Sequence, residues 1–171
     1  MESQCENSVK INTMSIICAE RSFISGNVTI NAKNVIHPWV IIQSEGNDAS
    51  ITINEGNLIE EKCTIHAQNK HMTIGRNNWF QVGAKCFASN IGDGCILESG
   101  SYVGSKASLA DNCIIGAGCV FDPDQEECLQ EGIILQPSRR YNSNVSHVQD
   151  IIHHRDHSAS LLKNTQEIRR V

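Results

Sequence analysis

An apolar residue recurs every six positions along most of this chain, and this spacing restricts the possible folds more than any other feature of the sequence. The longest unbroken run consists of Ile91, Leu97, Val103, Leu109, Ile115 and Phe121. A period of six matches neither the repeat of an amphipathic helix nor the two-residue alternation of a strand. It is typical of a parallel β-helix, whose coils stack on one another along a common axis.

Three hexapeptides form one triangular coil, so the apolar positions group in threes. The groups are Ile11/Ile17/Ile24, Ile30/Ile36/Ile42, Ile53/Ile59/Ile65, Ile74/Phe80/Cys86, Ile91/Leu97/Val103 and Leu109/Ile115/Phe121. A partial seventh coil is expected around Leu129 to Leu135. We predict an all-β repeat fold, a left-handed parallel β-helix of about six to seven triangular coils over residues 1–140. Residues 141–171 are predicted to form a C-terminal α-helix and tail.

Interruptions of the period fall mainly at one corner of the expected prism. Extra residues follow Ile42 and Ile65, each after the third strand of its coil. Insertions in a repeat protein map to loops on one face, often the binding face. The sequence therefore predicts that one edge carries two polar loops, Gln43–Ser50 and Ala67–Met72.

The fifth position of each hexapeptide points inward at a corner, where only small side chains fit. Residues in this position include Cys63, Cys95, Cys113, Cys119, Asn34, Asn57 and Asn78. The 8 cysteines include no CxxC pair, and no secretory signal peptide is recognised. We interpret them as reduced, mostly buried thiols, with Cys5 and Cys128 accessible. The asparagines are expected to form amide ladders along the axis.

Composition favours one soluble intracellular domain. The net charge is −5 with no basic cluster, which argues against nucleic acid or an anionic membrane surface as the main partner. No apolar run approaches the ~20 residues that span a bilayer, so no membrane insertion is expected.

Hexapeptide-repeat acyltransferases form one class in which this repeat occurs, and they use a histidine as general base. A histidine suits that task because its pKa lies near neutral pH. His37, His66 and His71 are the candidates on the coils. The chain has no separate substrate domain, so we interpret these histidines as ordinary surface residues and keep acyl transfer as an alternative.

The stretches Ile53–Ile59 and Ile65–Ala67 resemble the part of the gamma-class carbonic anhydrases that ends in their first zinc histidine. The resemblance implies that His66 occupies the first ligand position, and it places the other two at Val82 and Phe87. Catalytic zinc needs three protein ligands and an open water position, which valine and phenylalanine cannot supply. We therefore predict no metal, no cofactor and no catalytic residue, with His66 a vestigial position.

Two histidines near the C-terminus give a second possible metal site. His153 and His157 are four residues apart, so they lie on one side of the expected helix. Such a pair can bind a metal ion, but no third ligand is in register. We interpret the pair as part of a solvated helix face.

Several segments resemble the dynactin subunit 6 family over residues 8–140. They include Val35–Pro38, Glu55–Glu61, Gly26–Ile30, Ile74–Asn78 and Cys113–Ala117. The resemblance implies a non-catalytic, cytoplasmic, cytoskeleton-associated subunit. Its implied partners are a paralogous β-helical protein, dynactin subunit 5, and the actin-related protein at the pointed end of the dynactin filament. It also implies a role in dynein cargo binding.

Outward residues of the coils are the candidates for contact with such partners. Trp39 and Trp79 lie off the inward six-residue phase, so both are expected on an outer face. Possible charged residues around the contact are Glu60, Glu61 and Glu98, together with Arg21 and Arg76. The open backbone at each end of a β-helix gives a further physical reason for a partner.

Overall fold

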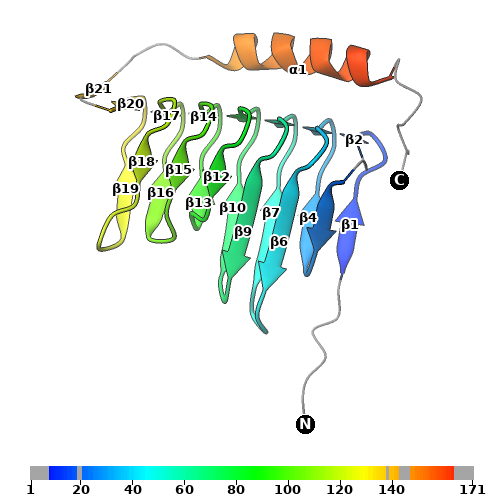
Figure 1. Cartoon of the computed structure of the whole chain (residues 1–171), viewed down its shortest axis with the longest axis horizontal. Coiled ribbons are helices and arrows are strands. Elements are labelled where there is room, and N and C mark those ends of the chain that lie inside the picture. Colours follow the sequence, from blue (N-terminus) through cyan, green and yellow to red (C-terminus); the bar gives the residue numbers. More distant parts are fainter. Residues whose placement is uncertain (1–7, 19–20, 138, 143–146, 164–171) are drawn as a thin grey trace.

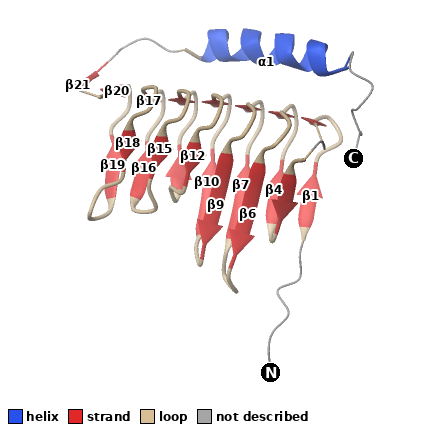
Figure 2. Ribbon diagram, viewed as in Figure 1, coloured by secondary structure: helices blue, strands red, loops and turns tan. Residues whose placement is uncertain are grey.

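The computed structural model describes residues 8–18, 21–137, 139–142 and 147–163. These residues form three sheets of short strands around a triangular prism, with one helix along its side (Figures 1 and 2). Each coil contributes one strand to each sheet, and all pairs between coils are parallel. The predicted parallel β-helix with a C-terminal helix is confirmed.

The three sheets contain 7, 8 and 6 strands. The first sheet consists of β1 (Val9–Ile11), β4 (Val28–Ile30), β7 (Ser50–Ile53), β10 (His71–Ile74), β13 (Asn90–Ile91), β16 (Ala107–Leu109) and β19 (Glu127–Leu129). The second consists of β2 (Ile16–Ile17), β5 (Val35–Ile36), β8 (Leu58–Ile59), β11 (Trp79–Phe80), β14 (Ile96–Leu97), β17 (Ile114–Ile115), β20 (Ile133–Gln136) and β21 (Arg139–Asn142). The third consists of β3 (Phe23–Ser25), β6 (Ile41–Glu45), β9 (Thr64–Gln68), β12 (Lys85–Cys86), β15 (Tyr102–Val103) and β18 (Val120–Phe121).

The register of the strands places the predicted apolar residues in three inward columns. In the second sheet, Ile17 pairs with Ile36, Ile36 with Ile59, and Ile59 with Phe80. These four side chains are buried. Because every coil repeats the same inward pattern, the core is continuous along the whole prism. The expected seventh coil is present as β19 and β20.

The polar residues at the inward corners form the expected ladder. The Asn57 backbone N–H donates to Asn34 Oδ1 at 2.8 Å, and the Asn78 N–H donates to Asn57 Oδ1 at 2.8 Å. Further along the same column, the Cys113 thiol donates to the carbonyl of Gln130 at 3.1 Å. Buried side chains thus replace the water that these backbone groups cannot reach.

The four corner cysteines, Cys63, Cys95, Cys113 and Cys119, are buried and free, as predicted. Burial raises the pKa of the Cys63 and Cys86 thiols to about 12, so both remain protonated at neutral pH. Cys128 is exposed, as expected, and Cys5 lies outside the described residues.

The two predicted polar loops lie at the expected edge, but half of Gln43–Ser50 and most of Ala67–Met72 is strand rather than loop. β6 and β9 pair in parallel as far as Glu45 and Gln68, and β7 and β10 already pair at Ser50 and His71. The prediction of loops was wrong because the extra residues extend two sheets together and satisfy their backbone groups in pairs. The longer strands extend beyond the other coils in Figure 1.

Helix α1 (Val148–Lys163) runs along the second sheet, as Figure 1 shows. Before it, β21 pairs antiparallel with β20 and ends the parallel stacking of that sheet. β21 crosses the boundary predicted at residue 140, so the division into two parts stays a prediction. Among the described residues, no helix is both long and apolar enough to cross a membrane.

We predict that Ile74→Asp unfolds the prism, because an unpaired carboxylate in the buried inward column costs several kcal/mol. Thr73→Asp is the matched control, since Thr73 is the exposed neighbour on the same strand. Its free energy of unfolding should stay within about 0.5 kcal/mol of the original. Urea denaturation followed by circular dichroism measures both. Equal effects of the two substitutions would contradict the assigned phase.

Candidate interaction surface

The outer face of the first sheet is polar. Its outward residue comes one position before the inward residue in each strand, and these outward residues are aligned by the strand pairing. They are Lys10, Thr29, Thr52, Thr73, Asn90, Ser108 and Cys128. Hydroxyl and amide groups are well solvated by water, so this face needs no protein partner.

The outer face of the second sheet is apolar. At the same outward position it carries Ile16, Val35, Leu58, Trp79, Ile96, Ile114 and Ile134. Helix α1 covers this row, and Ile151 of the helix packs with Ile96, Ile114 and Ile134 in a small second core. The chain therefore supplies its own cover for this face.

Polar and aromatic contacts add to this packing. The Trp79 ring stacks on His154 with 4.5 Å between ring centroids. Arg155 Nη1 donates to the Gly56 carbonyl at 3.2 Å, and Asp156 pairs with the same guanidinium at 2.7 Å. Trp79, predicted on a free outer face, is instead half-buried beneath the helix, because the outward row to which it belongs is apolar.

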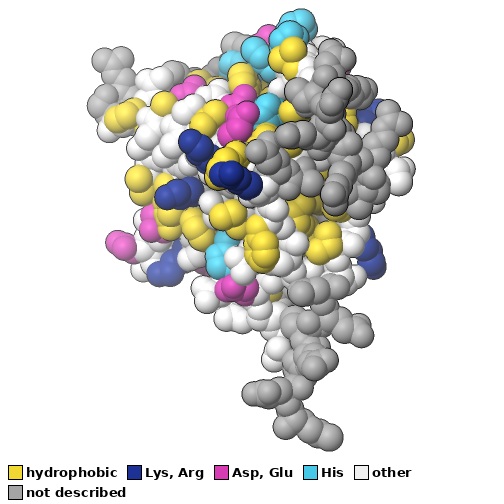
Figure 3. Space-filling view, turned by 45° about the vertical axis from the view of Figure 1, so that its right-hand side comes forward, with side chains coloured by type: hydrophobic (Ala, Val, Ile, Leu, Met, Phe, Trp, Pro, Cys, Tyr) yellow, Lys and Arg dark blue, Asp and Glu magenta, His cyan; other side chains and the backbone are white. Residues whose placement is uncertain are grey.

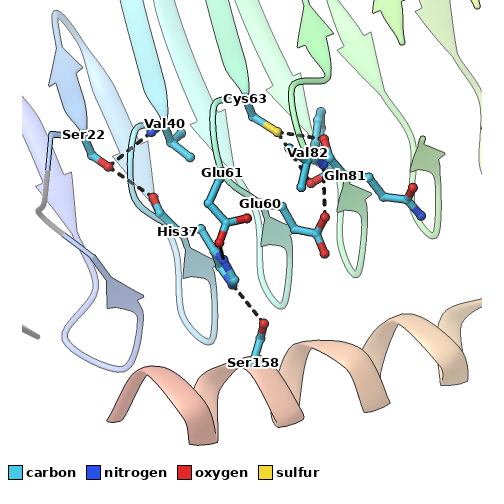
Figure 4. A network of polar contacts seen from close by, with 10 residues as sticks. Ser22, His37, Val40, Glu60, Glu61, Cys63, Gln81, Val82 and Ser158 are labelled. Atoms are coloured by element: carbon cyan, nitrogen blue, oxygen red, sulfur yellow. Dashed lines mark hydrogen bonds and ion pairs between the residues drawn. The ribbon is translucent and has the colours of Figure 1, made fainter. Parts of the chain in front are cut away.

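His37 connects the prism to the helix in the contact drawn in Figure 4. Its Nδ1 lies 2.8 Å from Glu61 Oε1, and its Nε2 lies 2.9 Å from Ser158 Oγ. The His37 side chain is 13% exposed. An imidazole held at both nitrogens in this way positions the helix and leaves neither nitrogen free for proton transfer.

Glu61 has a pKa below its ordinary value. Partial burial opposes its ionisation, but the hydrogen bond with His37 and the nearby positive charge of His37 and Lys62 outweigh that effect. A lowered carboxyl pKa contributes stability above the ordinary pKa, and this stability is lost as the pH falls through the lowered pKa. The contribution is small because the Glu61 side chain is 40% exposed.

We predict that His37→Ala lowers the free energy of unfolding by about 1–3 kcal/mol, because Glu61 and Ser158 both lose a partly buried partner. The control is His71→Ala, which removes the exposed contact with Ser50 at another edge of the prism. Urea denaturation at neutral pH compares the two variants. If His37→Ala were as mild as His71→Ala, the contact would not hold the helix. In acid the difference should shrink as Glu61 is protonated.

The other two candidate carboxylates bind the backbone of the next coil. Glu60 Oε2 accepts from the Val82 N–H at 3.0 Å, and Glu98 Oε2 accepts from the Ala117 N–H at 2.8 Å. Both residues follow an inward residue of the second sheet, at the corner toward the third. Their carboxylates thus stabilise corners, and any contact with a partner would compete with these hydrogen bonds.

The outer face of the third sheet combines exposed apolar side chains with basic ones. Its outward row consists of Phe23, Ile41, Thr64, Lys85, Tyr102 and Val120. Phe23 is 53% exposed, Ile41 39% and Val120 67%. Figure 3 shows one side of the molecule, on which hydrophobic side chains reach the surface beside both basic and acidic ones. No described element covers this row as α1 covers the second sheet.

Trp39 lies at the corner beside this row and is 41% exposed. The Arg21 guanidinium stacks over its ring, with the carbon 4.3 Å from the ring centroid. Trp39 has a φ of 66°, in the left-handed region that favours glycine. Of the two tryptophans predicted on an outer face, Trp39 is the one that solvent reaches freely.

The position resembling a zinc ligand has aromatic neighbours. The His66 ring lies 5.9 Å from the Phe87 ring in the next coil, which lies 5.3 Å from Tyr102. Val82 follows β11 at another corner of the prism, so the three positions do not meet within one chain. His66 Nε2 lies 3.3 Å from Glu45 Oε2, an ion-pair distance without hydrogen-bond geometry.

The remaining histidines give no ligand set within one chain either. His71 Nδ1 contacts Ser50 Oγ at 2.7 Å, and His153 and His157 are exposed on α1. Within the ranges that the structure describes, no group of three His, Cys, Asp or Glu side chains could hold a metal ion together.

The apolar row of the second sheet is the functional feature that the sequence reasoning missed. In each second hexapeptide the residue before the inward one is also apolar, which gives pairs such as Val35-Ile36, Leu58-Ile59 and Ile114-Ile115. In the first sheet that residue is polar. This difference between the three hexapeptides of a coil is visible in the sequence and marks the face that the helix covers.

Comparisons with known proteins agree with the fold. A family model described as Bacterial transferase hexapeptide (six repeats) matches residues 88–123. A solved structure described as an acetyltransferase from Bacillus cereus covers 92% of this chain and 91% of its own, with 18% identity and a TM-score of 0.68. A UDP-N-acetylglucosamine acyltransferase from Bacteroides fragilis covers 84% and 66%, with 18% identity and a TM-score of 0.54. These similarities define the class, a hexapeptide-repeat β-helix, and show the fold alone.

Curated relatives narrow the class to one family. Dynactin subunit 6 of Danio rerio is 40% identical over 127 residues, which cover 67% of this chain and 64% of the relative. The Xenopus tropicalis protein is 40% identical over 67% of this chain and 61% of its own length. Dynactin subunit 6 of Nematostella vectensis is 37% identical over 77% of this chain and 76% of its own. The chain belongs to the dynactin subunit 6 family, and it matches less than two thirds of the length of the first two relatives.

Proposed function

We propose that this chain is a non-catalytic structural subunit of dynactin. Its role would be to pair with the paralogous β-helical dynactin subunit 5 and the actin-related protein at the pointed end of the filament, and to support dynein cargo binding. The proposal includes a cytoplasmic, cytoskeleton-associated location. The observation that carries it is the identity of 37–40% with proteins named Dynactin subunit 6, over 67% to 77% of this chain.

The uncovered third face supports a role in assembly. The first face of the prism is polar, and the second is covered by the chain's own helix. Among the residues that the structure describes, the third face is the one that exposes large apolar side chains, at Phe23, Ile41 and Val120. Such a face suits association with another protein, because buried apolar surface drives most protein–protein binding.

Two observations favour a scaffold over the alternative enzymes. The histidines that acyl transfer could use as bases have structural contacts, with His37 held at both nitrogens. The zinc-like position His66 has Phe87 beside it where the carbonic anhydrase resemblance places a ligand. The similarity to solved acyltransferases, at 18% identity, shows a shared fold and gives no evidence of a shared activity.

We predict that the chain, tagged and expressed in cells of the organism from which it comes, elutes with dynactin on gel filtration. Mass spectrometry of that fraction should find dynactin subunit 5 and the pointed-end actin-related protein. A second affinity step through another dynactin subunit should recover the tagged chain. Recovery of the chain as a homotrimer free of dynactin subunits would contradict the proposal and favour an enzyme.

A further prediction concerns metal content. Purified without a histidine tag, the chain should contain no stoichiometric zinc, because valine and phenylalanine stand at two of the three ligand positions. Plasma mass spectrometry measures zinc per chain, and a CO₂ hydration assay measures activity. His66→Ala should leave both at background and leave the elution with dynactin unchanged. Zinc near one per chain that is lost in His66→Ala would restore the anhydrase alternative.

A further inference from the structure

One corner of the third sheet places large side chains where the backbone favours glycine. Arg21, Trp39 and Lys62 have φ angles of 52°, 66° and 61°. A left-handed conformation costs a residue with a side chain roughly 1–2 kcal/mol. The first three coils therefore accept backbone strain at this corner.

Later coils use glycine at the same corner. Gly83, Gly100 and Gly118, each three positions before an inward residue, have φ angles of 72°, 68° and 66°. A Cβ built on any of these three glycines meets nothing within 4 Å, so a side chain at this corner points into open space. The strain in the first three coils is thus not offset by packing against the prism, apart from the contact between Arg21 and Trp39. The same conformation recurs at the corner between the first and second sheets, at Lys33, Asn77 and Asn112, so it belongs to the turn of the repeat. What distinguishes this corner is that it places Arg21, Trp39 and Lys62 in the open beside the outward row.

The charged side chains within the two rows of this face are basic. Its corner and outward rows contain Arg21, Lys62 and Lys85 but no Asp or Glu, although the chain as a whole has a net charge of −5. Acids do border these rows. At the corner toward the second sheet, Glu60 and Glu98 accept from backbone N–H groups and Glu61 is held by His37. At the other edge, Glu45 lies beside His66, and Asp122 follows β18. The acids that border the face thus hold contacts of the prism itself, whereas Lys62 and Lys85 extend from the two rows as exposed basic side chains.

We infer that the third-face patch, formed by Arg21, Phe23, Trp39, Ile41, Lys62 and Lys85, binds a protein partner whose contacting surface has acidic side chains around an apolar centre. The inference rests on the proposed role as a subunit of an assembly. Trp39 and Phe23 supply the apolar contact, and aromatic and arginine residues carry most of the energy in protein interfaces. The three cations select an acidic partner and orient it.

Trp39→Gly separates this role from a structural one. Glycine removes the backbone strain at a φ of 66°, but it also loses more conformational entropy on folding than a residue with a side chain. The two effects on stability are opposite and of similar size, so the melting temperature should stay nearly unchanged. The fraction of chain that elutes in the assembly should fall by about tenfold or more. Lys33→Gly is the matched control, because Lys33 is an exposed residue with a φ of 60° at another corner. It should assemble like the original chain.

Charge reversal and lysine footprinting test the same face independently. Lys85→Glu should reduce assembly, whereas Lys10→Glu, on the polar first face, should not. In cell extract, a limiting acetylating reagent is applied to the assembled fraction and to the purified free chain. Lys62 and Lys85 should react several-fold less in the assembly, and Lys10 should react equally in both.

The outcomes of these experiments distinguish a failure of the third-face patch from a failure of the proposed function. Normal assembly of Trp39→Gly, or equal reaction of Lys62 and Lys85 in a fraction that contains dynactin subunits, would overturn the patch and leave the proposed function intact. Protection of both lysines in an assembly without dynactin subunits would uphold the patch and overturn the proposed function. A chain that elutes only as a single copy would overturn both.

Discussion

Parallel hydrogen bonding between successive coils is the interaction on which the rest of this structure depends. Each strand bonds to the strand of the same sheet in the next coil, so every residue is stacked on an equivalent residue. A residue that suits its corner in one coil must suit the residues above and below it. The six-residue period is the sequence consequence of that stacking.

The inward corner between the first and second sheets shows how the stack tolerates a change of chemistry. Asn34, Asn57 and Asn78 each accept a hydrogen bond from a backbone N–H of the next coil. The last of these bonds runs from the Cys95 N–H to Asn78 Oδ1 at 2.6 Å, and from there on the column consists of cysteines. A thiol is smaller than an amide and donates one hydrogen bond, so from Cys95 onward the side chain donates to a carbonyl instead. The Asn78 amide nitrogen has no hydrogen-bond partner at this junction. The column of hydrogen bonds thus continues through the change from asparagine to cysteine, with one buried amide nitrogen left unsatisfied.

The sequence predicted what depends on stacking and missed what depends on distant contacts. The inward columns, the corner cysteines and the asparagine ladder follow from spacing alone, because they repeat within each coil. The stacking of Trp79 on His154 and the contact of His37 with Ser158 each join a coil to a helix far along the chain. Spacing within the repeat carries no information on such pairs.

For the same reason, only some of the residues predicted at an interface are exposed in the structure. An outward position can face solvent, the helix or the next corner, and the six-residue phase does not distinguish these cases. Glu60 and Glu98 bind backbone amides, while Trp39 remains exposed. The two polar loops were mistaken in the same way, since paired insertions in neighbouring coils can extend a sheet together.

The outward positions are also where proteins of this fold can differ in function without changing the prism. The stacking constrains the inward residues, so a catalytic centre or a docking face has to be built on the corners and outer rows. In this chain the position that resembles a zinc ligand belongs to a row of rings, His66, Phe87 and Tyr102, in successive coils. The His66 ring meets the Phe87 ring edge to face, and the Phe87 ring lies tilted against Tyr102, geometries that stabilise pairs of aromatic rings. A few outward substitutions on one backbone can therefore replace a set of metal ligands by a row of aromatic contacts.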